Sequence, residues 1–321
     1  MKSLLTLWKF SRPHTIIGTI LSITTLYLIF SKIQYANGYN QGKVNLIELF
    51  FADFPTYLLT LIACISCNLF ITGLNQIYDI DIDRINKPNL PLITGELNTS
   101  EAKRIIVISG LIAISLAFNL SYYFGGLICF IMILGIIYSV PPFRLKQSHL
   151  WAASFISLVR GILVNLGIYI HFHILLAGFP IKLPSSILML TLFITLFSIG
   201  IAWFKDLPDI EGDSQHNIGS LAVKKSPKFA LTTGTILVGL GYVTTIIYAI
   251  VRLNTPSFKN YSTLDTLNSW LFVIYHIVGL IAFLLMVKQL NINNKNGLKR
   301  FYRSYWILFF LEYLSFLMLL K

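Results

Sequence analysis

Long apolar stretches, each separated from the next by a short polar segment, dominate the pattern of this chain. A helix that crosses the hydrocarbon core of a bilayer needs about 20 predominantly apolar residues. Nine stretches are close to that length, which predicts an all-α, multi-pass membrane protein with nine transmembrane helices. Their expected bounds are 14–33, 56–78, 104–121, 123–140, 150–172, 184–204, 229–251, 269–288 and 302–320.

Positive charge is distributed unevenly between the connections. Most of the 25 Lys and Arg residues lie near the N-terminus or around the connections after the second, fourth, sixth and eighth stretches. Because Lys and Arg are enriched on the cytoplasmic side of membrane proteins, these segments are expected to share the cytoplasmic or stromal side. Nine spans would then place the C-terminus on the opposite side.

The composition supports a protein embedded in a lipid bilayer. Of the 321 residues, 55% are hydrophobic and only 12% are charged, and the mean hydropathy is +0.73. Soluble domains carry about 25% charged residues, so a soluble enzyme and a disordered chain are excluded. The net charge of +12 follows from the basic segments beside the spans and does not indicate nucleic-acid binding. The three cysteines lie in apolar stretches and are expected to be buried and reduced.

Acidic residues are concentrated in two short segments on the basic side of the membrane. Seven of the 13 Asp and Glu residues lie in 79–83 and 206–213, each directly after an apolar stretch. Carboxylates near hydrocarbon are costly, which makes such a concentration typical of a functional site. Two facing groups of carboxylates repel one another unless a cation lies between them.

Spacing predicts which residues of the first segment act together. On a continuous helix, steps of four residues would place Asn75, Asp79 and Asp83 on one face, whereas Asp81 would project elsewhere.

The second segment repeats this spacing. Asp209 and Asp213 are again four residues apart, and Asp206 precedes Asp209 by three. Pro208 and Gly212 weigh against a regular helix there.

These acidic segments predict a Mg²⁺-dependent diphosphate site. Oxygen ligands with open coordination suit Mg²⁺, which binds carboxylates together with substrate phosphate oxygens. The remaining phosphate charge needs cations, and basic residues follow spans on the same side of the membrane: Arg84, Lys87, Arg144, Lys146 and Lys205.

The membrane setting narrows the identity of the diphosphate. A soluble nucleotide would not need nine apolar spans around its site, whereas a polyprenyl diphosphate has a hydrocarbon tail that does. Ionisation of an allylic diphosphate creates a carbocation that must be kept from water, and aromatic faces stabilise cations. Tyr78, Tyr138 and Trp203 end spans near the acidic segments, although such residues are equally typical of an interfacial aromatic belt.

Five segments together resemble the UbiA-type intramembrane prenyltransferases, in particular their homogentisate branch. The resemblance implies one integral membrane domain over residues 1–321, with nine helices around a central cavity that binds Mg²⁺ and a prenyl diphosphate. The segments are RPHTIIGT at 12–19, NQIYDIDIDRINKPNLPL at 75–92, YSVPPFRLK at 138–146, KDLPDIEGD at 205–213 and FFLEYL at 309–314.

The resemblance also implies metal ligands. Asp79 and Asp83 would hold one Mg²⁺, with Asn75 assisting. Asp209 and Asp213 would hold a second ion.

Contacts to the substrate follow from the same motifs. Arg144, Lys146 and Lys205 would bind the diphosphate, and Tyr138 would lie against the allyl cation. Asp206 matches the motif as either a metal ligand or an orienting residue.

The homogentisate branch implies an aromatic acceptor that carries a carboxylate. Homogentisate would be prenylated ortho to a phenol hydroxyl with loss of CO₂, towards tocopherol or plastoquinone. Its carboxylate needs a positive partner, for which Arg12 at the entrance of the first span and Arg160 within the fifth are candidates. A mid-span arginine is usually functional, but a structural role for Arg160 stays open. His14 either contacts the acceptor or caps the first span.

Several alternatives stay open. Phytyl transfer is favoured by the RPHTIIGT segment, but geranylgeranyl or solanesyl transfer, or a macrocyclic acceptor as in chlorophyll synthase, share the acidic motifs. A transporter would also contain intramembrane charges, yet it does not explain acids and bases gathered at one membrane face. The resemblance implies a cyanobacterial or plastid membrane. The sequence predicts neither an oligomeric state nor a function for Glu312 in the last span.

Overall fold

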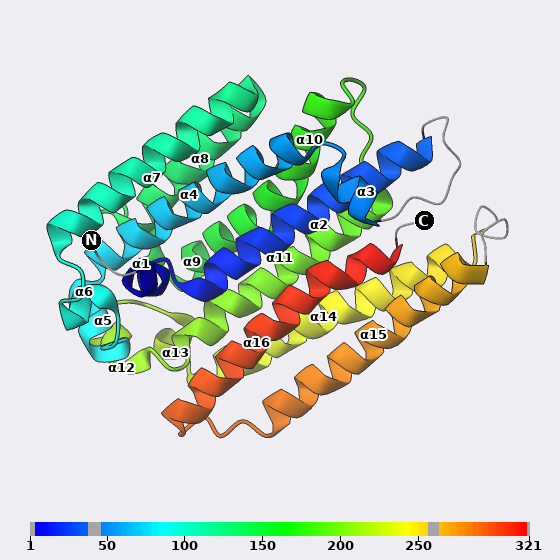
Figure 1. Cartoon of the computed structure of the whole chain (residues 1–321). Coiled ribbons are helices and arrows are strands. Elements are labelled where there is room, and N and C mark those ends of the chain that lie inside the picture. The colour runs from blue at the N-terminus through cyan, green and yellow to red at the C-terminus, as the bar shows by residue number, and fades with distance from the viewer. Residues whose placement is uncertain (1–3, 38–45, 256–262, 320–321) are drawn as a thin grey trace.

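The computed structural model describes residues 4–37, 46–255 and 263–319, and the regular elements within these ranges are helices. Long helices lie side by side in one bundle (Figure 1). Within the described ranges they are α2 (Pro13–Asn37), α4 (Phe54–Tyr78), α7 (Thr99–Leu120), α8 (Tyr122–Ser139), the continuous segment α9 (His149–Ser157), η2 (Leu158–Gly167) and α10 (Ile168–Leu176), α11 (Ser185–Asp206), α14 (Pro227–Leu253), α15 (Thr263–Lys288) and α16 (Lys295–Ser315).

Short helices gather at the two ends of the bundle (Figure 1). The end near the N-terminus carries α1 (Leu4–Phe10), α5 (Ile80–Asn86), α6 (Pro91–Thr94), η1 (Leu145–Gln147), α12 (Ile210–Gln215) and α13 (Leu221–Lys224). The other end carries α3 (Leu46–Phe51) and η4 (Phe316–Leu319). Both acidic segments therefore lie at the same end, as the sidedness of the basic residues predicts.

The ninth span, expected at 302–320, begins earlier in the structure, and its first turns are basic. Eight helices of the described ranges are long and apolar enough to cross a membrane, and α16 is not among them. Its first turns are basic, with Lys295, Lys299, Arg300 and Arg303, so its apolar part is short. α16 nevertheless runs along the bundle beside α2 and ends at the opposite end from α1, as an odd number of crossings requires (Figure 1). The protein is a multi-pass membrane protein.

Aromatic and polar contacts hold α16 inside the bundle. The ring of Tyr305 stacks on that of Phe197 of α11, with 4.1 Å between centroids, and its hydroxyl donates to the Phe197 carbonyl at 2.8 Å. Glu312 Oε2 lies 3.1 Å from His276 Nε2 of α15, and both side chains are fully buried. Glu312 thus lies against an imidazole of a neighbouring helix, and the two form an ion pair when that ring is protonated.

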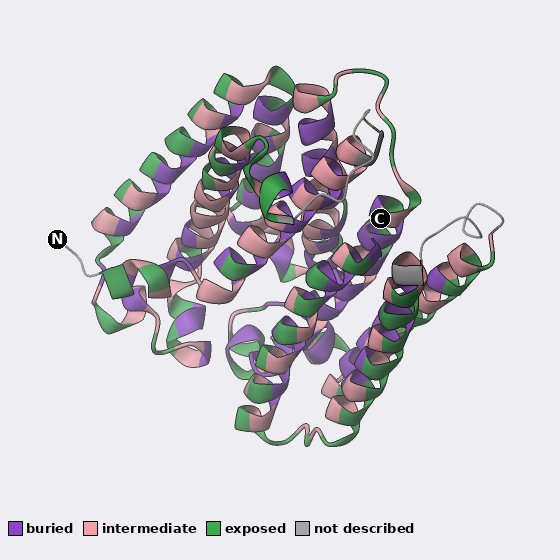
Figure 2. Cartoon of the chain, turned by 45° about the vertical axis from the view of Figure 1, so that its right-hand side comes forward, coloured by how far each residue is buried: buried purple, intermediate pink, exposed green. Residues whose placement is uncertain are grey.

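The outer faces of the long helices are apolar. Figure 2 shows exposed residues along these outer faces and buried residues towards the interior. Leu111 of α7, Ile247 of α14 and Ile281 of α15 are among the exposed large side chains. Exposed apolar faces of this extent suit contact with lipid.

Polar caps define where several helices begin. Asn98 and Glu101 form a capping box at α7: Glu101 N–H donates to Asn98 Oδ1 at 2.8 Å, and Asn98 N–H donates to the Glu101 carboxylate at 3.0 Å. Ser121 and Ser226 accept hydrogen bonds at the starts of α8 and α14. These caps satisfy backbone donors that have no partner within the helix.

The helices η2 and α11 approach each other most closely at a glycine. A Cβ atom built on Gly161 would lie 2.6 Å from the Cα atom of Thr195, so the backbones would have to separate. We expect Gly161→Ala to destabilise the folded protein by about 1–3 kcal/mol, as overpacking does. Thermal unfolding of the purified protein in detergent would measure this as a lower apparent Tm.

Gly126 of α8 provides the matched control. A Cβ atom at Gly126 meets nothing within 4 Å. Gly126→Ala is therefore expected to leave the Tm unchanged or slightly higher. An equal Tm for the two variants would contradict the close packing at Gly161.

Candidate active site

Two helix breaks position the acidic residues at one end of the bundle. α4 ends at Tyr78, and Asp79 adopts φ −111° and ψ 10° before α5 begins. The expectation of one continuous helix through Asn75, Asp79 and Asp83 is therefore wrong, because the chain turns at Asp79. The second break lies between α11 and α12 and contains Pro208, as the sequence predicts.

A buried asparagine joins the two acidic segments. Asn86 of α5 donates from Nδ2 to Asp213 Oδ1 at 3.4 Å and accepts from the Gly212 N–H at 3.1 Å. A Cβ atom at Gly212 would lie 2.6 Å from Asn86 Oδ1, so a larger residue there would displace the Asn86 amide. These contacts hold α5 beside α12 although they are far apart in the sequence.

The two segments face one polar pocket. Its lining includes most of the residues that the sequence predicts for the metal, the diphosphate, the allyl cation and the acceptor. They are Arg12, Asn75, Asp79, Asp83, Tyr138, Lys146, Lys205, Asp206, Asp209 and Asp213, and Lys87 joins them.

Lys87 forms a cationic bridge between the segments. Its Nζ atom lies 3.1 Å from Asp83 Oδ1 and 2.8 Å from Asp209 Oδ2. Arg12 Nη2 lies 3.5 Å from the other oxygen of Asp83. Both carboxylates are buried, so these cations reduce the repulsion between them.

A second group of ion pairs surrounds Asp79. Lys146 Nζ contacts Asp79 Oδ1 directly, and Arg144 Nη2 lies 3.2 Å from the same oxygen. Arg144 also donates to the Tyr78 carbonyl at 3.0 Å. Lys205 Nζ lies 3.5 Å from Asp206 Oδ1. The pocket therefore contains cations and carboxylates in close contact.

Two of the arginines adopt a strained backbone conformation. Arg12 has φ 55° and Arg144 has φ 39°, in the left-handed region that L-residues rarely occupy. Such strain persists only where surrounding contacts hold it, and it is concentrated at functional sites. The ion pairs to Asp83 and Asp79 supply such contacts here.

Burial and neighbouring charges shift the ionisation of the site. Burial acts to raise the pKa of Asp79, but the ammonium of Lys146, together with the charges of Arg12 and Lys87, outweighs it, and the net shift is downward. Burial lowers the pKa of Lys146 to about 8 against the opposing effect of Asp79. Burial, followed by the charge of Asp206, raises the pKa of Asp213 to about 7. An additional cation at Asp213 would favour its ionised form.

The donor atoms of this pocket fit Mg²⁺. In the described ranges no three His, Cys, Asp or Glu side chains converge closely enough to form a metal site, because lysines pair with the carboxylates. The available ligands are all oxygen atoms, drawn from two opposed segments, which is the chemistry that Mg²⁺ prefers. Lys87 already supplies one positive charge between them.

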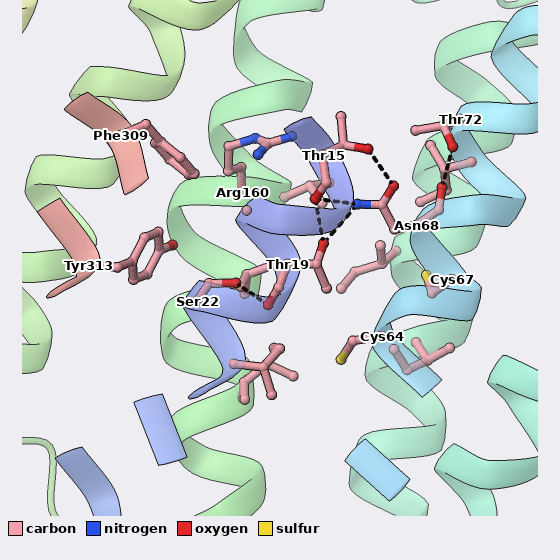
Figure 3. A pocket seen from close by; sticks show the side chains of 18 residues that line it. Thr15, Thr19, Ser22, Cys64, Cys67, Asn68, Thr72, Arg160, Phe309 and Tyr313 are labelled. Atoms are coloured by element: carbon pink, nitrogen blue, oxygen red, sulfur yellow. Dashed lines mark hydrogen bonds between the residues drawn. The ribbon is translucent and has the colours of Figure 1, made fainter. Parts of the chain in front are cut away.

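Four positions considered in the sequence analysis do not line this pocket. Asp81 is exposed and pairs with Arg84 at 3.1 Å, so it projects away as expected. His14 contacts the Trp306 ring edge-on, with 4.8 Å between centroids, and the described residues show no capping hydrogen bond from it. Arg144 lies at the rim, and Arg160 lines a second cavity deeper in the bundle (Figure 3).

Comparison with known proteins matches this geometry to a family. Residues 48–312 match the UbiA prenyltransferase family. The chain belongs to this family. It is 36% identical to a homogentisate phytyltransferase of Synechocystis sp. over 98% of the chain and 95% of the relative. It is 34% identical to a chloroplastic homogentisate solanesyltransferase of Arabidopsis thaliana over 96% of the chain and 75% of that protein.

The fold is that of other UbiA proteins. A UbiA homolog from Archaeoglobus fulgidus, solved with GPP and Mg²⁺, superposes with a TM-score of 0.59 at 18% identity, covering 98% of this chain and 99% of that one. The predicted family, the all-helical fold and the prenyltransferase class are thereby confirmed. The family also favours an enzyme over the transporter alternative.

The sequence prediction of the site in this UbiA prenyltransferase missed one residue and left the position of another open. Lys87 was recognised only as one of several basic residues near the acidic segment, and Asn86 was not singled out. Both lie in the INKP sequence that follows the first acidic segment. Their position within the matched motif was the available signal.

Proposed function

We propose that this protein transfers a prenyl group from a prenyl diphosphate to homogentisate, with Mg²⁺, and that phytyl is the preferred group. The supporting observation is the polar pocket itself, where two acidic segments and five basic side chains meet at the end of a membrane bundle. The similarity to homogentisate prenyltransferases supports the acceptor. We also propose that residues 1–321 form one domain and that it resides in a cyanobacterial or plastid membrane, as in these relatives.

The acidic residues would hold the metal. Asp79 and Asp83, with Asn75, would bind one Mg²⁺, and Asp209 and Asp213 another, with Asp206 as a further ligand or an orienting group. When bound, Mg²⁺ neutralises phosphate oxygens and so stabilises the departing diphosphate.

The basic residues would bind the diphosphate. Lys146, Lys205, Arg144 and Lys87 lie around the carboxylates, and each would gain a phosphate partner when substrate binds. Charge-assisted hydrogen bonds of this kind strengthen as negative charge develops on the leaving group.

The reaction balances without an external oxidant or reductant. The C1–O bond of the allylic diphosphate breaks, and its electron pair leaves with diphosphate. The acceptor ring carbon ortho to a phenol hydroxyl attacks C1 and then loses its proton. The acetate side chain loses CO₂ and its methylene carbon takes up a proton to become a methyl group, so the two proton transfers balance. Tyr138 lines the pocket and would present its aromatic ring to the allyl cation.

Product formation tests this function directly. Membranes containing the protein would be incubated with Mg²⁺, labelled homogentisate, and phytyl, geranylgeranyl or solanesyl diphosphate. We expect Mg²⁺-dependent prenylated, decarboxylated product, with the highest kcat/KM for phytyl diphosphate. Membranes without the protein serve as the control.

Three results would contradict the proposal at different levels. No product with any donor would reject the acceptor. A preference for solanesyl or geranylgeranyl diphosphate would reject only the chain length. Full activity in excess chelator would reject the metal dependence.

A further inference from the structure

A second cavity of about 160 Å³ lies deeper in the bundle than the polar pocket. Along α4, Asn75 lines the polar pocket, whereas Thr72, Asn68 and Cys64 line the deeper cavity. In Figure 3, Arg160 and Phe309 lie on one side of this cavity, and Asn68 and Thr72 lie on the other. The deeper cavity therefore lies further along α4 than the polar pocket, towards the middle of the span.

Arg160 brings a positive charge to this cavity without a protein counter-charge. Its Cζ atom lies 4.7 Å from the centroid of the Trp306 ring and 5.4 Å from that of Phe309. Its Nε atom is buried and has no hydrogen-bond partner, and no described carboxylate pairs with its guanidinium. Aromatic faces offset only part of the cost of a guanidinium at this depth. An anionic ligand would supply the missing partner.

The backbone around Arg160 is held by dedicated contacts. Residues Leu158–Gly167 form a π-helix, a conformation that is frequent at functional sites. Asn165, which is fully buried, donates from Nδ2 to the carbonyls of Arg160 at 3.2 Å and Gly161 at 2.6 Å. The Tyr313 hydroxyl donates to Asn165 Oδ1 at 3.0 Å. This arrangement fixes where the Arg160 side chain begins.

We infer that Arg160 binds the carboxylate of the aromatic acceptor, with the ring between Arg160 and the polar pocket. This inference deepens the proposed function and rests on it for the identity of the acceptor. Arg160 Nη1 lies 3.5 Å from a Cβ atom built on Gly18, which is six residues after Arg12, the residue that precedes α2. Six residues of helix rise about 9 Å, a separation that accommodates a small arylacetate below the diphosphate.

Most of the cavity wall is apolar, but it contains a strip of polar side chains. Asn68 donates to Thr19 Oγ1 at 2.8 Å and accepts from Thr15 Oγ1 at 3.0 Å. These groups can exchange hydrogen bonds with ring hydroxyls, whereas a hydrocarbon tail would leave the Arg160 guanidinium without an anionic partner.

Steady-state kinetics with two acceptors test the assignment. Arg160→Gln should raise the KM for homogentisate at least tenfold, as loss of a charge-assisted hydrogen bond implies. The KM for prenyl diphosphate should change less than twofold. Methylhydroquinone, which lacks the carboxylate, should be used equally well by wild type and Arg160→Gln. Arg160→Lys, which keeps the charge, should restore part of the homogentisate affinity.

Calorimetric titration provides a readout that does not need turnover. Wild-type protein in detergent should bind both homogentisate and phenylacetate at least tenfold more tightly than Arg160→Gln does. Arg252→Gln is the matched control, because Arg252 donates to the Leu319 carbonyl at the far end of the bundle. It should bind both acids like wild type.

The outcomes separate this inference from the proposed function. An equal rise in KM for prenyl diphosphate and for homogentisate in Arg160→Gln would overturn it. A changed preference for donor chain length with unchanged homogentisate affinity would also overturn it, and would indicate that the cavity binds the prenyl tail. If Arg160→Gln does not fold, a rise in KM in Arg160→Lys that is as large for prenyl diphosphate or methylhydroquinone as for homogentisate would overturn it equally. If wild type does not prenylate homogentisate, the proposed function fails, while weaker phenylacetate binding by Arg160→Gln would still support a carboxylate site.

Discussion

Asp83→Asn and Asp209→Asn are each expected to lower kcat/KM for prenyl transfer by about 10³-fold. Both carboxylates are buried, face the same pocket and share the ammonium of Lys87. Asparagine keeps the shape but removes the negative charge that would hold Mg²⁺ against the diphosphate. Loss of a preorganised electrostatic contact in such a site costs about 10²–10³-fold for one neutral donor, and the loss of a metal ligand adds to it.

Initial rates at saturating and limiting Mg²⁺ would measure this effect, with protein amounts normalised by size-exclusion chromatography. Asp81→Asn is the matched control, because Asp81 belongs to the same segment but is exposed and pairs only with Arg84. It should retain activity within about twofold, since exposed ion pairs contribute little. A loss in Asp81→Asn equal to that in Asp83→Asn would show that the assigned metal-binding face is wrong.

Lys87→Met is expected to lower kcat/KM by about 10²-fold, because one cation that would face the diphosphate is lost. A second effect should appear without substrate. Asp83 and Asp209 would lose the ammonium that lies between them, so the Tm in chelator should fall. Mg²⁺ should restore much of this loss, because it can supply the missing positive charge.

Lys103→Met is the control for removing a lysine from the same side of the membrane. Lys103 is exposed on α7, outside the polar pocket, and its replacement should change neither activity nor Tm. Wild-type activity in Lys87→Met would exclude Lys87 from diphosphate binding. A Tm unaffected in chelator would exclude it as a counter-charge for the two aspartates.

Local sequence patterns predicted the bundle well because each span is a property of its own residues. Eight helices match the apolar stretches, since burial in hydrocarbon requires continuous apolar length. The last span was less well defined, because the basic first turns of α16 lower its hydropathy. Its place in the bundle depends on Tyr305 and Glu312, whose partners belong to other helices.

The acidic residues of the site were also predictable, because their spacing and their position at span ends are visible in the chain. The helical phase assigned to Asp79 was wrong in detail, since the chain turns at that residue. Asp83 lines the same pocket nevertheless, because the Asp83 N–H donates to the Asp79 carbonyl at 2.7 Å and continues the coil. This backbone hydrogen bond therefore keeps Asp79 and Asp83 at the same pocket, as the four-residue spacing predicted.

By itself, the sequence determined the membrane setting, the family and the grouping of acidic and basic segments at one end of the bundle, because apolar length, charge and motif are encoded locally. Only the tertiary structure decided which charges neutralise one another and where the second cavity lies. Lys87 bridges Asp83 to Asp209, and Asn86 contacts Asp213, across more than 100 residues of intervening chain. Such contacts depend on where α4 and α11 break and on how α5 and α12 then pack together, and no local pattern contains that information.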